Sequence, residues 1–390
     1  MVEFPRIDAH LEEAGVDGYL IDAAADSSDQ RYLSGYDAPD PFFTLYEPDR
    51  LALLVSGLEY GRAREHSRGD VVYRFADFDY DALRAEHGAT EGRNRMVAAF
   101  LEEVSVGAVA VPPRFPVATA DGLRDHGVRV RPDHDEVVTL SRARKTAAEV
   151  DHVRRAQRAN EAALRAAEDL LAEATDVEGV LHHDGDPLTA ERVRAAIELA
   201  LLRNGCAAEE TIVAPAEQGA DPHERGHGPI PADEPVVIDV FPRDKETKYH
   251  ADMTRTLLVG EPAPELTERY AVVEAALEAG LEAVEPGVSG ETVHDAACDV
   301  IESAGYQTLR SDPQAETGFI HSTGHGVGLD IHEFPRLAPG GTALEPGHIV
   351  TVEPGLYDPA VGGVRLEDIV VVTPDGHENL TDYPLELVVA

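Results

Sequence analysis

Four acidic residues in the second half of the chain stand beside or within apolar segments typical of β-strands. They are Asp239 at the end of PVVID, Asp252 at the start of DMTRT, Glu353 after HIVTV and Glu367 in VRLED. An ionised carboxylate is costly in a β-rich core unless another group compensates its charge. One such acid alone is an ordinary strand-end residue, but four together require a shared counter-charge. We therefore expect the fold to bring these strand ends to one place.

A glycine-rich stretch, HSTGHGVGLDIHEFPR at residues 321–336, adds histidines at positions 321, 325 and 332. Its glycines let the backbone approach other groups closely, which suits a site better than a plain core element. One alternative is an exposed glycine-rich turn that carries solvent-facing histidines. Another is a dinucleotide-binding fingerprint, but G-H-G-V-G lacks the final spacing and no βαβ unit opens here.

Two divalent cations would supply the missing counter-charge, because four negative carboxylates balance four positive charges. One neutral imidazole completes the ligand set. Oxygen-rich ligation with one nitrogen suits manganese, cobalt or iron and tolerates zinc. A thiolate-dependent site is excluded, because neither Cys206 nor Cys298 is near these segments.

The composition indicates a folded protein with an acidic surface. Aspartate and glutamate number 74 against 33 lysines and arginines, which gives a formal net charge of −41. The acids are interleaved with periodic apolar positions, unlike a disordered acidic tract. Such a charge argues against nucleic acid as a partner. Because concentrated salt screens self-repulsion, we infer a halophilic protein from a salt-rich cytoplasm.

The sequence predicts a cytoplasmic protein that does not enter a membrane. The start MVEFPRIDAH has no basic stretch followed by an apolar core, so no signal peptide is apparent. No apolar run approaches the roughly 18 residues of a membrane span. The two isolated cysteines are typical of buried or free thiols in a reducing compartment.

A chain of 390 residues is expected to form two domains. Residues 1–138 alternate helical segments with strand-like runs such as RLALLV and GAVAV, which predicts a small α/β domain. Residues 139–390 form the second domain and begin with an alanine-rich connecting helix at about 143–174. Strands and further helices at about 264–284 and 290–305 follow. This second domain is therefore expected to be α+β, with a mostly antiparallel sheet flanked by helices.

One zinc-protease signature is rejected on its context. HERGH at residues 223–227 fits H-E-x-x-H, which places both histidines on one face only when the segment is helical. Here Asp-Pro precedes the motif, Gly-Pro follows it, and Gly226 lies inside it. The segment is expected to be a loop.

Five motifs in order carry a resemblance to a known family. The chain reads D…Y-x-x-D-M-T-R-T…H-x-x-x-H-G-x-G-L-x-x-H-E…V-E-P-G-L-Y…G-G-x-R-x-E-D between residues 239 and 368. This order resembles the pita-bread metallopeptidases, which include prolidase, aminopeptidase P and methionine aminopeptidase, over about residues 205–385. The first half more weakly resembles the creatinase-type amino-terminal domain of prolidases and aminopeptidases P, with YLSGY at residues 32–36 as one point of contact.

The resemblance implies a role for each matching residue. Asp239 would chelate one metal ion, His325 and Glu353 the other, and Asp252 and Glu367 would bridge them. The implied catalytic residues are Glu353, His332, His321 and His223, and the implied substrate-binding residues are His223, His321, His332, Arg336 and Arg365. Tyr249 and Arg255 match the supporting members of the second motif, and the resemblance also implies a homodimer.

The spacing of the first two acids departs from the family pattern. Asp239 and Asp252 are 13 positions apart, two more than is usual in the family, and the intervening DVFPRDKETKYHAD lacks the glycine found there. A longer hairpin turn would leave both ligands in place if the strand ends keep their register. It would alter the pocket wall near Phe241 and Arg243.

The motif HEFPR predicts the substrate. Prolidases resemble one another in an arginine three residues after the His-Glu pair, and Arg336 holds that position. Its guanidinium can bind the free carboxylate of a dipeptide in bidentate fashion. We therefore expect dinuclear-metal hydrolysis of Xaa-Pro dipeptides. The alternatives are an Xaa-Pro aminopeptidase acting on longer peptides, a metallo-amidohydrolase acting on a non-peptide amide, a non-catalytic binding module, or an Arg336 that only pairs with surface acids.

Overall fold

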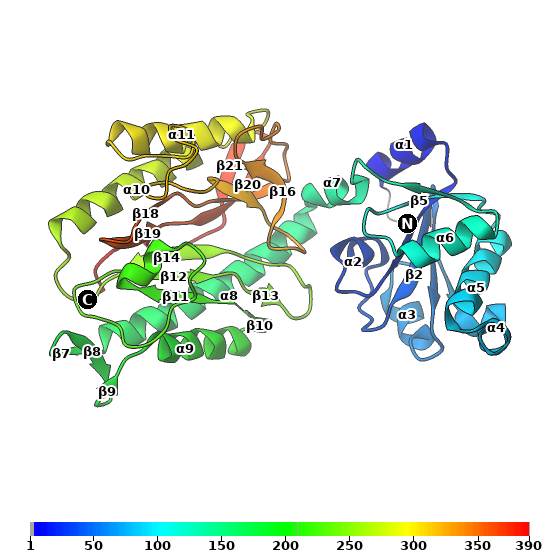
Figure 1. Cartoon of the computed structure of the whole chain (residues 1–390), viewed down its shortest axis with the longest axis horizontal. Coiled ribbons are helices and arrows are strands. Elements are labelled where there is room, and N and C mark those ends of the chain that lie inside the picture. The colour runs from blue at the N-terminus through cyan, green and yellow to red at the C-terminus, as the bar shows by residue number, and fades with distance from the viewer. Residues whose placement is uncertain (1–3, 209, 390) are drawn as a thin grey trace. The chain divides into compact units, whose positions relative to one another are not determined.

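The computed structural model describes residues 4–208 and 210–389, and the chain divides into two compact units, Met1–Arg142 and Ala143–Ala390 (Figure 1). Each unit contains hydrophobic cores built from its own residues. The two units are therefore described separately.

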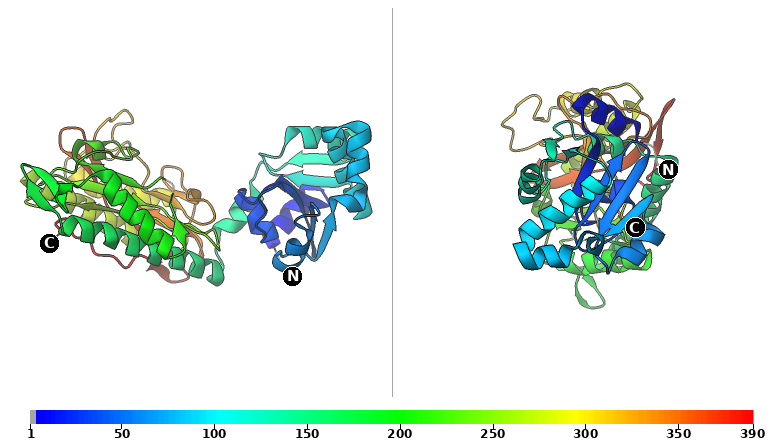
Figure 2. Two further views of the ribbon diagram at one scale, coloured as in Figure 1. Left: turned by 90° about the horizontal axis from the view of Figure 1, so that it is seen from below. Right: turned by 90° about the vertical axis from the view of Figure 1, so that its right-hand side faces the viewer.

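The first unit is a mixed six-stranded sheet in the order β4-β3-β2-β1-β5-β6, with helices on both faces (Figure 2). Its strands are β1 Gly18–Ala23, β2 Phe42–Glu47, β3 Arg50–Val55, β4 Val71–Arg74, β5 Ala108–Val111 and β6 Arg129–Pro132. Its helices are α1 Pro5–Ala14, α2 Ser28–Ser34, α3 Tyr60–His66, α4 Tyr80–His87, α5 Ala89–Glu103, α6 Val117–Asp125 and α7 Val137–Ala143. The predicted α/β character is confirmed.

The continuous apolar run RLALLV is explained by this two-sided cover. In β3, Leu51 and Leu53 face the core formed with α1, α2 and α7, whereas Ala52 and Leu54 face the core formed with α5 and α6. Successive strand residues point to opposite faces, so a strand covered on both faces needs apolar residues at every position.

The second unit begins with a long helix, α8 Ala147–Ala172, which packs beside α9 Ala190–Arg203. A capping box starts α8, because Thr146 accepts a hydrogen bond from the Glu149 backbone N–H while the Glu149 carboxylate accepts one from the Thr146 backbone N–H. Buried alanines such as Ala156 and Ala163 line its inner face. Their small side chains allow a close approach to α9 and to the sheet.

The sheets of this unit contain only antiparallel named pairs among the described residues, as predicted. One sheet has the order β11-β12-β14 and another has the order β16-β15-β17-β20-β21. The strands are β7 Thr175–Val177, β8 Val180–His183, β9 Asp186–Pro187, β10 Cys206–Ala207, β11 Ile212–Pro215, β12 Val236–Val240, β13 Arg243–Asp244, β14 Met253–Leu257, β15 Gly324–Gly326, β16 Glu333–Leu337, β17 Ile349–Val352, β18 Gly355–Asp358, β19 Gly362–Arg365, β20 Asp368–Thr373 and β21 Gly376–Asn379.

Two helix pairs cover these sheets. Helices α8 and α9 share a core with β11, β12 and β14, whereas α10 Pro264–Glu282 and α11 Gly290–Ser303 share a second core with β17 to β20 (Figure 1). The strands that carry the four acids thus lie between helices on both sides. The polar segment HHDGDP at residues 182–187 forms the turn at Asp184 and Gly185 that joins β8 to β9 in the small sheet β7-β8-β9.

The two extra residues between Asp239 and Asp252 lie in a longer turn that begins with β13. Asp244 is buried and accepts two hydrogen bonds from Arg155 on α8, at 2.8 and 2.6 Å. The pairing of β12 with β14 nevertheless runs unbroken from Val236 opposite Leu257 to Val240 opposite Met253. The longer turn therefore does not interrupt the pairing of the two strands that carry Asp239 and follow Asp252.

Both cysteines are free and buried, as expected from their isolation in the sequence. Burial raises the pKa of the Cys206 thiol to about 11, and it does the same for Cys298. No helix among the described residues is long and apolar enough to cross a membrane.

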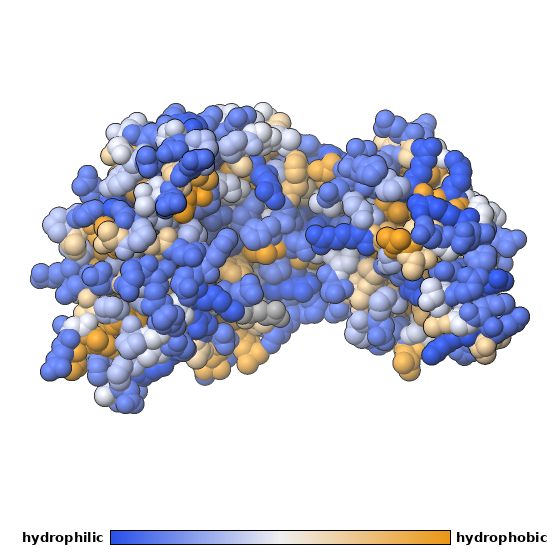
Figure 3. Space-filling view, viewed as in Figure 1, coloured by the Kyte–Doolittle hydropathy of each residue, from blue (hydrophilic) through white to orange (hydrophobic). Residues whose placement is uncertain are grey.

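The thermal midpoint of unfolding should rise steeply as KCl increases from about 50 mM to about 2 M, because salt screens the repulsion of a surface with a net charge of −41. Figure 3 shows a face of the molecule on which hydrophilic side chains dominate. Scanning calorimetry across the KCl series measures the effect. Sucrose is the control, because it favours the folded state by exclusion without screening charge. Equal midpoints at the two ends of the series would contradict the halophilic interpretation.

Candidate metal centre

The five predicted ligands come from strands that are separate in the sequence and adjacent in the fold. Asp239 lies in β12, Asp252 precedes β14, His325 lies in β15, Glu353 follows β17 and Glu367 precedes β20. One donor atom from each of Asp252, His325 and Glu367 lies within 4.8 Å of the others. Glu353 Oε1 is 3.2 Å from His325 Nε2, and the charge of Asp239 acts directly on Asp252. The structure thus gathers all five residues.

The electrostatics of this group show an excess of negative charge. Burial, and then the charge of Asp239, raises the pKa of Asp252 well above its ordinary value. Burial and the charge of Asp252 do the same to the pKa of Glu367. Burial also opposes ionisation of Glu353, but its hydrogen bond with His325 lowers the pKa of Glu353 to about 2. A bound cation would relieve this repulsion.

Two buried carboxylate oxygens support a metal site directly. Asp239 Oδ1 and Glu367 Oε1 are shielded from solvent and have no hydrogen-bond partner among the described residues. A buried polar atom without a partner is costly, and native structures contain few of them. Oxygen atoms from carboxylates, with one imidazole nitrogen, are ligands that divalent metals accept. The donor set therefore fits the predicted ions.

The local backbone presents His325 to this group. Its Nδ1–H donates to the carbonyl of Gly326 at 3.2 Å, which leaves Nε2 facing the carboxylates. Burial alone would lower the pKa of His325, but the hydrogen bond and charge of Glu353 raise it to about 9. Gly324 is required beside it, because a Cβ there would lie 2.0 Å from the carbonyl oxygen of Thr351.

Two threonine hydroxyls hold the carboxylates and were not identified from the sequence. Thr254 donates to Glu367 Oε2 at 2.8 Å, and Thr351 donates to Glu353 Oε1 at 3.1 Å. The available signal was a threonine on an otherwise apolar strand face, as in DMTRT, where a buried hydroxyl needs a partner. Because each carboxylate is held by a short side chain on a strand, its position is well defined.

Arg365 is buried and connects one predicted ligand to a predicted substrate residue. It donates to Asp239 Oδ2 at 2.7 Å and to the Tyr357 hydroxyl at 3.0 Å. The Tyr357 hydroxyl lies 2.8 Å from His321 Nε2, and His321 Nδ1 lies 2.8 Å from the Ser322 carbonyl. The carbonyl requires Nδ1–H, so Nε2 accepts from Tyr357. Burial lowers the pKa of His321 to about 4, which keeps the ring neutral at neutral pH. Tyr357 lies in the motif VEPGLY, but the sequence alone indicates no role for it.

The remaining predicted residues lie on the exposed side of the centre. The His332 ring is 4.4 Å from the His325 ring between centroids, and burial together with His325 lowers the pKa of His332. His223 lies in a loop, and its charge contributes to lowering the pKa of both His321 and His332. Arg336 is exposed and lies directly opposite His325 in the β15–β16 ladder. Because residues 223–227 contain no helix, rejection of the zinc-protease signature is confirmed.

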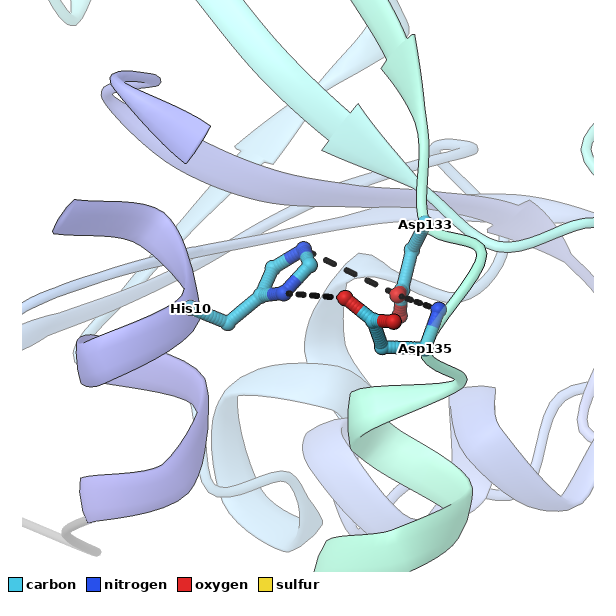
Figure 4. A group of neighbouring side chains, drawn as sticks. All are labelled: His10, Asp133 and Asp135. Atoms are coloured by element: carbon cyan, nitrogen blue, oxygen red, sulfur yellow. Dashed lines mark hydrogen bonds and ion pairs between the residues drawn. The ribbon is translucent and has the colours of Figure 1, made fainter. Parts of the chain in front are cut away.

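A second group of potential metal donors lies in the first unit, where His10 on α1 faces Asp133 and Asp135 (Figure 4). Both carboxylate oxygens of Asp133 already accept hydrogen bonds, from the Tyr19 hydroxyl and from the backbone N–H groups of Asp135 and Val137. The His10 ring nitrogens lie 3.7 and 3.8 Å from the two acids. These contacts join α1 to the start of α7.

Comparison with protein families matches both units. Residues 151–374 match the description Metallopeptidase family M24, and residues 5–132 match the Creatinase/Prolidase N-terminal domain.

Individual relatives agree with these matches. The chain is 31% identical over 373 residues to the Xaa-Pro dipeptidase of Pyrococcus furiosus, covering 91% of each chain. The solved Xaa-Pro dipeptidase from Bacillus anthracis superposes with a TM-score of 0.82 at 26% identity, covering 99% of both chains. The X-Pro aminopeptidase from Thermotoga maritima has a TM-score of 0.80 at 24% identity, covering 97% of this chain and 100% of that one, and therefore shares the fold.

Proposed function

Because the chain belongs to metallopeptidase family M24, we propose that it hydrolyses the peptide bond before proline, preferentially in Xaa-Pro dipeptides, with two divalent metal ions. Asp239 would bind one ion, His325 and Glu353 the other, and Asp252 and Glu367 both. Manganese or cobalt suits this oxygen-rich set with one imidazole best, and iron or zinc is also compatible. When bound, the ions would activate a water molecule and polarise the scissile carbonyl.

Protein groups would move and place the protons. Glu353 is the proposed proton acceptor, because its carboxylate lies inside the ligand group and is ionised there. A proline nitrogen leaves only after it gains a proton, and His332 is the proposed group that assists it. His321, held in one tautomer by Tyr357 and Ser322, would orient the substrate carbonyl from the other side, and His223 would complete this wall.

The position of Arg336 supports the proposed preference for dipeptides. Directly opposed residues of an antiparallel pair extend from the same face of the sheet, so Arg336 and His325 share a face. In an Xaa-Pro dipeptide, only the proline residue lies between the scissile carbonyl and the free carboxylate. One residue of extended chain spans about 3.5 Å, so the two groups are about that far apart. A guanidinium beside the metal ligand would therefore reach the carboxylate of a dipeptide, whereas a tripeptide carries its carboxylate one residue farther away.

A substrate panel tests the proposal. The purified protein, supplied with Mn²⁺ or Co²⁺ in concentrated KCl, should release proline from Xaa-Pro dipeptides faster than it cleaves Xaa-Pro-Xaa tripeptides. Dipeptides without proline serve as the specificity control. Faster cleavage of tripeptides would assign the Xaa-Pro aminopeptidase activity instead, and hydrolysis of none of these peptides would overturn the proposal. Metal analysis of the same preparation should give two equivalents per chain.

A further inference from the structure

A buried ion pair involves Glu333, the residue that directly follows His332 in the chain. Lys145 Nζ is 2.8 Å from Glu333 Oε2, and both side chains are only 1% exposed. Only three of the 33 basic residues of this chain are lysine, and Lys145 is the one that is buried. Removing two charges from water is costly, so such a pair is weak evidence for a stabilising role. We therefore consider which part of the backbone this ion pair holds in place.

The Glu333 carboxylate holds the turn that leads from His325 to His332. Its Oε2 pairs with Lys145, and its Oε1 accepts the backbone N–H of Asp330 at 3.0 Å. The turn lies tightly against this carboxylate, because a Cβ added at Gly328 would lie 2.6 Å from Glu333 Oε2. His332 directly precedes Glu333, the first residue of β16, so contacts that fix the Glu333 side chain restrain the backbone next to His332.

The other end of the pair is anchored just before α8. The Lys145 backbone N–H donates to the Gly347 carbonyl at 2.8 Å, and the next residue, Thr146, forms the capping box of that helix. Lys145 therefore lies outside the β15–β16 hairpin, in a segment whose backbone is itself hydrogen-bonded. Its ion pair with Glu333 connects the turn before His332 to the start of α8.

We propose that Lys145 is a positioning residue that acts through Glu333 to place His332 for the reaction. This inference rests on the proposed peptidase function, in which His332 assists the leaving nitrogen. The His332 ring lies 4.4 Å from the metal-ligand ring of His325, so a small displacement of the turn changes the distance from His332 to the substrate. Misplacing a catalytic group by about 1 Å can cost about 100-fold in rate.

A double-mutant cycle separates positioning from general damage. Lys145→Met should lower kcat on an Xaa-Pro dipeptide by about 10- to 100-fold, with metal content unchanged. In a His332→Ala background the same substitution should change kcat by less than about threefold, because the group that it positions is absent. The control is Lys245→Met at an exposed lysine, which should leave kcat unchanged. An equal loss in both backgrounds, or no loss in either, would overturn the inference.

A second variant and a second measurement keep the inference testable. If Lys145→Met does not fold, the double variant Lys145→Met/Glu333→Gln takes its place in the cycle, because it leaves no unpaired buried charge. NMR of isotope-labelled histidine gives a readout without turnover, with the His332 Cε1–H signal assigned by its loss in His332→Gln. That signal should shift in the Lys145 variant, and an unchanged signal would count against positioning. If the wild type cleaves no Xaa-Pro peptide, the proposed function fails, but the NMR result still decides the role of Lys145.

Discussion

Replacing Asp252 with asparagine should abolish metal loading and turnover together while stabilising the metal-free protein. Asp252 is 4% exposed and lies among Asp239, Glu353 and Glu367, whose charges repel its own. A neutral side chain relieves that repulsion when no ion is bound, but it also removes the carboxylate proposed to bridge both ions. Loss of the ions removes several kcal/mol of transition-state stabilisation, so kcat/KM should fall by at least about a thousandfold.

Three measurements check this result on one preparation. After dialysis, the metal content of the Asp252 variant should be zero, where the wild type retains two equivalents per chain, and kcat/KM should fall as well. In excess chelator, the thermal midpoint of the variant should exceed that of the chelated wild type. The matched control is Asp375→Asn, which removes the same charge at an exposed position between β20 and β21. Activity that survives in the Asp252 variant, or in wild type after exhaustive chelation, would rule out the proposed metal centre.

The strands, and the grouping of the four acids at neighbouring strand ends, were predictable because both depend on strong local constraints, whereas the metal-binding role of each residue stays a prediction implied by the resemblance. A run such as RLALLV must be buried on both sides, and an acid at the end of PVVID needs compensation wherever the strand lies. The pairing of β12 with β14 is continuous despite the longer turn, and Asp244 in that turn is held by Arg155 on α8. These features follow from segments of a few residues.

The supporting contacts were not predictable in the same way, because they join segments distant in the sequence. Lys145 and Glu333 are 188 positions apart, and Arg365 reaches Asp239 across 126 positions. Nothing in the local pattern of either residue indicates its partner. Tyr357 is part of the motif VEPGLY, but its contact with His321 depends on how the β18–β19 pair lies against the segment that precedes β15. Such contacts follow from the tertiary arrangement, which only the structure supplies.

Arg336→Ala should lower kcat/KM for an Xaa-Pro dipeptide by roughly 10- to 150-fold, because a charge-assisted hydrogen bond contributes about 1.5–3 kcal/mol. The side chain is exposed and lies opposite His325 in the ladder, so its removal should disturb neither the core nor the ligands. Cleavage of an Xaa-Pro-Xaa tripeptide should change little, because its carboxylate lies beyond the guanidinium. Arg336→Lys should give an intermediate loss, since it keeps the charge without the bidentate geometry.

The ratio of kcat/KM for the dipeptide to kcat/KM for the tripeptide makes this test independent of the net charge of the protein. Arg203→Ala, at an exposed position at the end of α9, makes the chain more acidic by the same unit and should leave both rates unchanged. All rates are compared at one KCl concentration, because salt weakens exposed charge pairing. An equal loss on dipeptide and tripeptide would mean that Arg336 does not read the substrate carboxylate, and the dipeptide preference would then need another explanation. A loss of kcat/KM confined to the dipeptide would identify Arg336 as the group that binds the dipeptide carboxylate and so favours substrates of two residues.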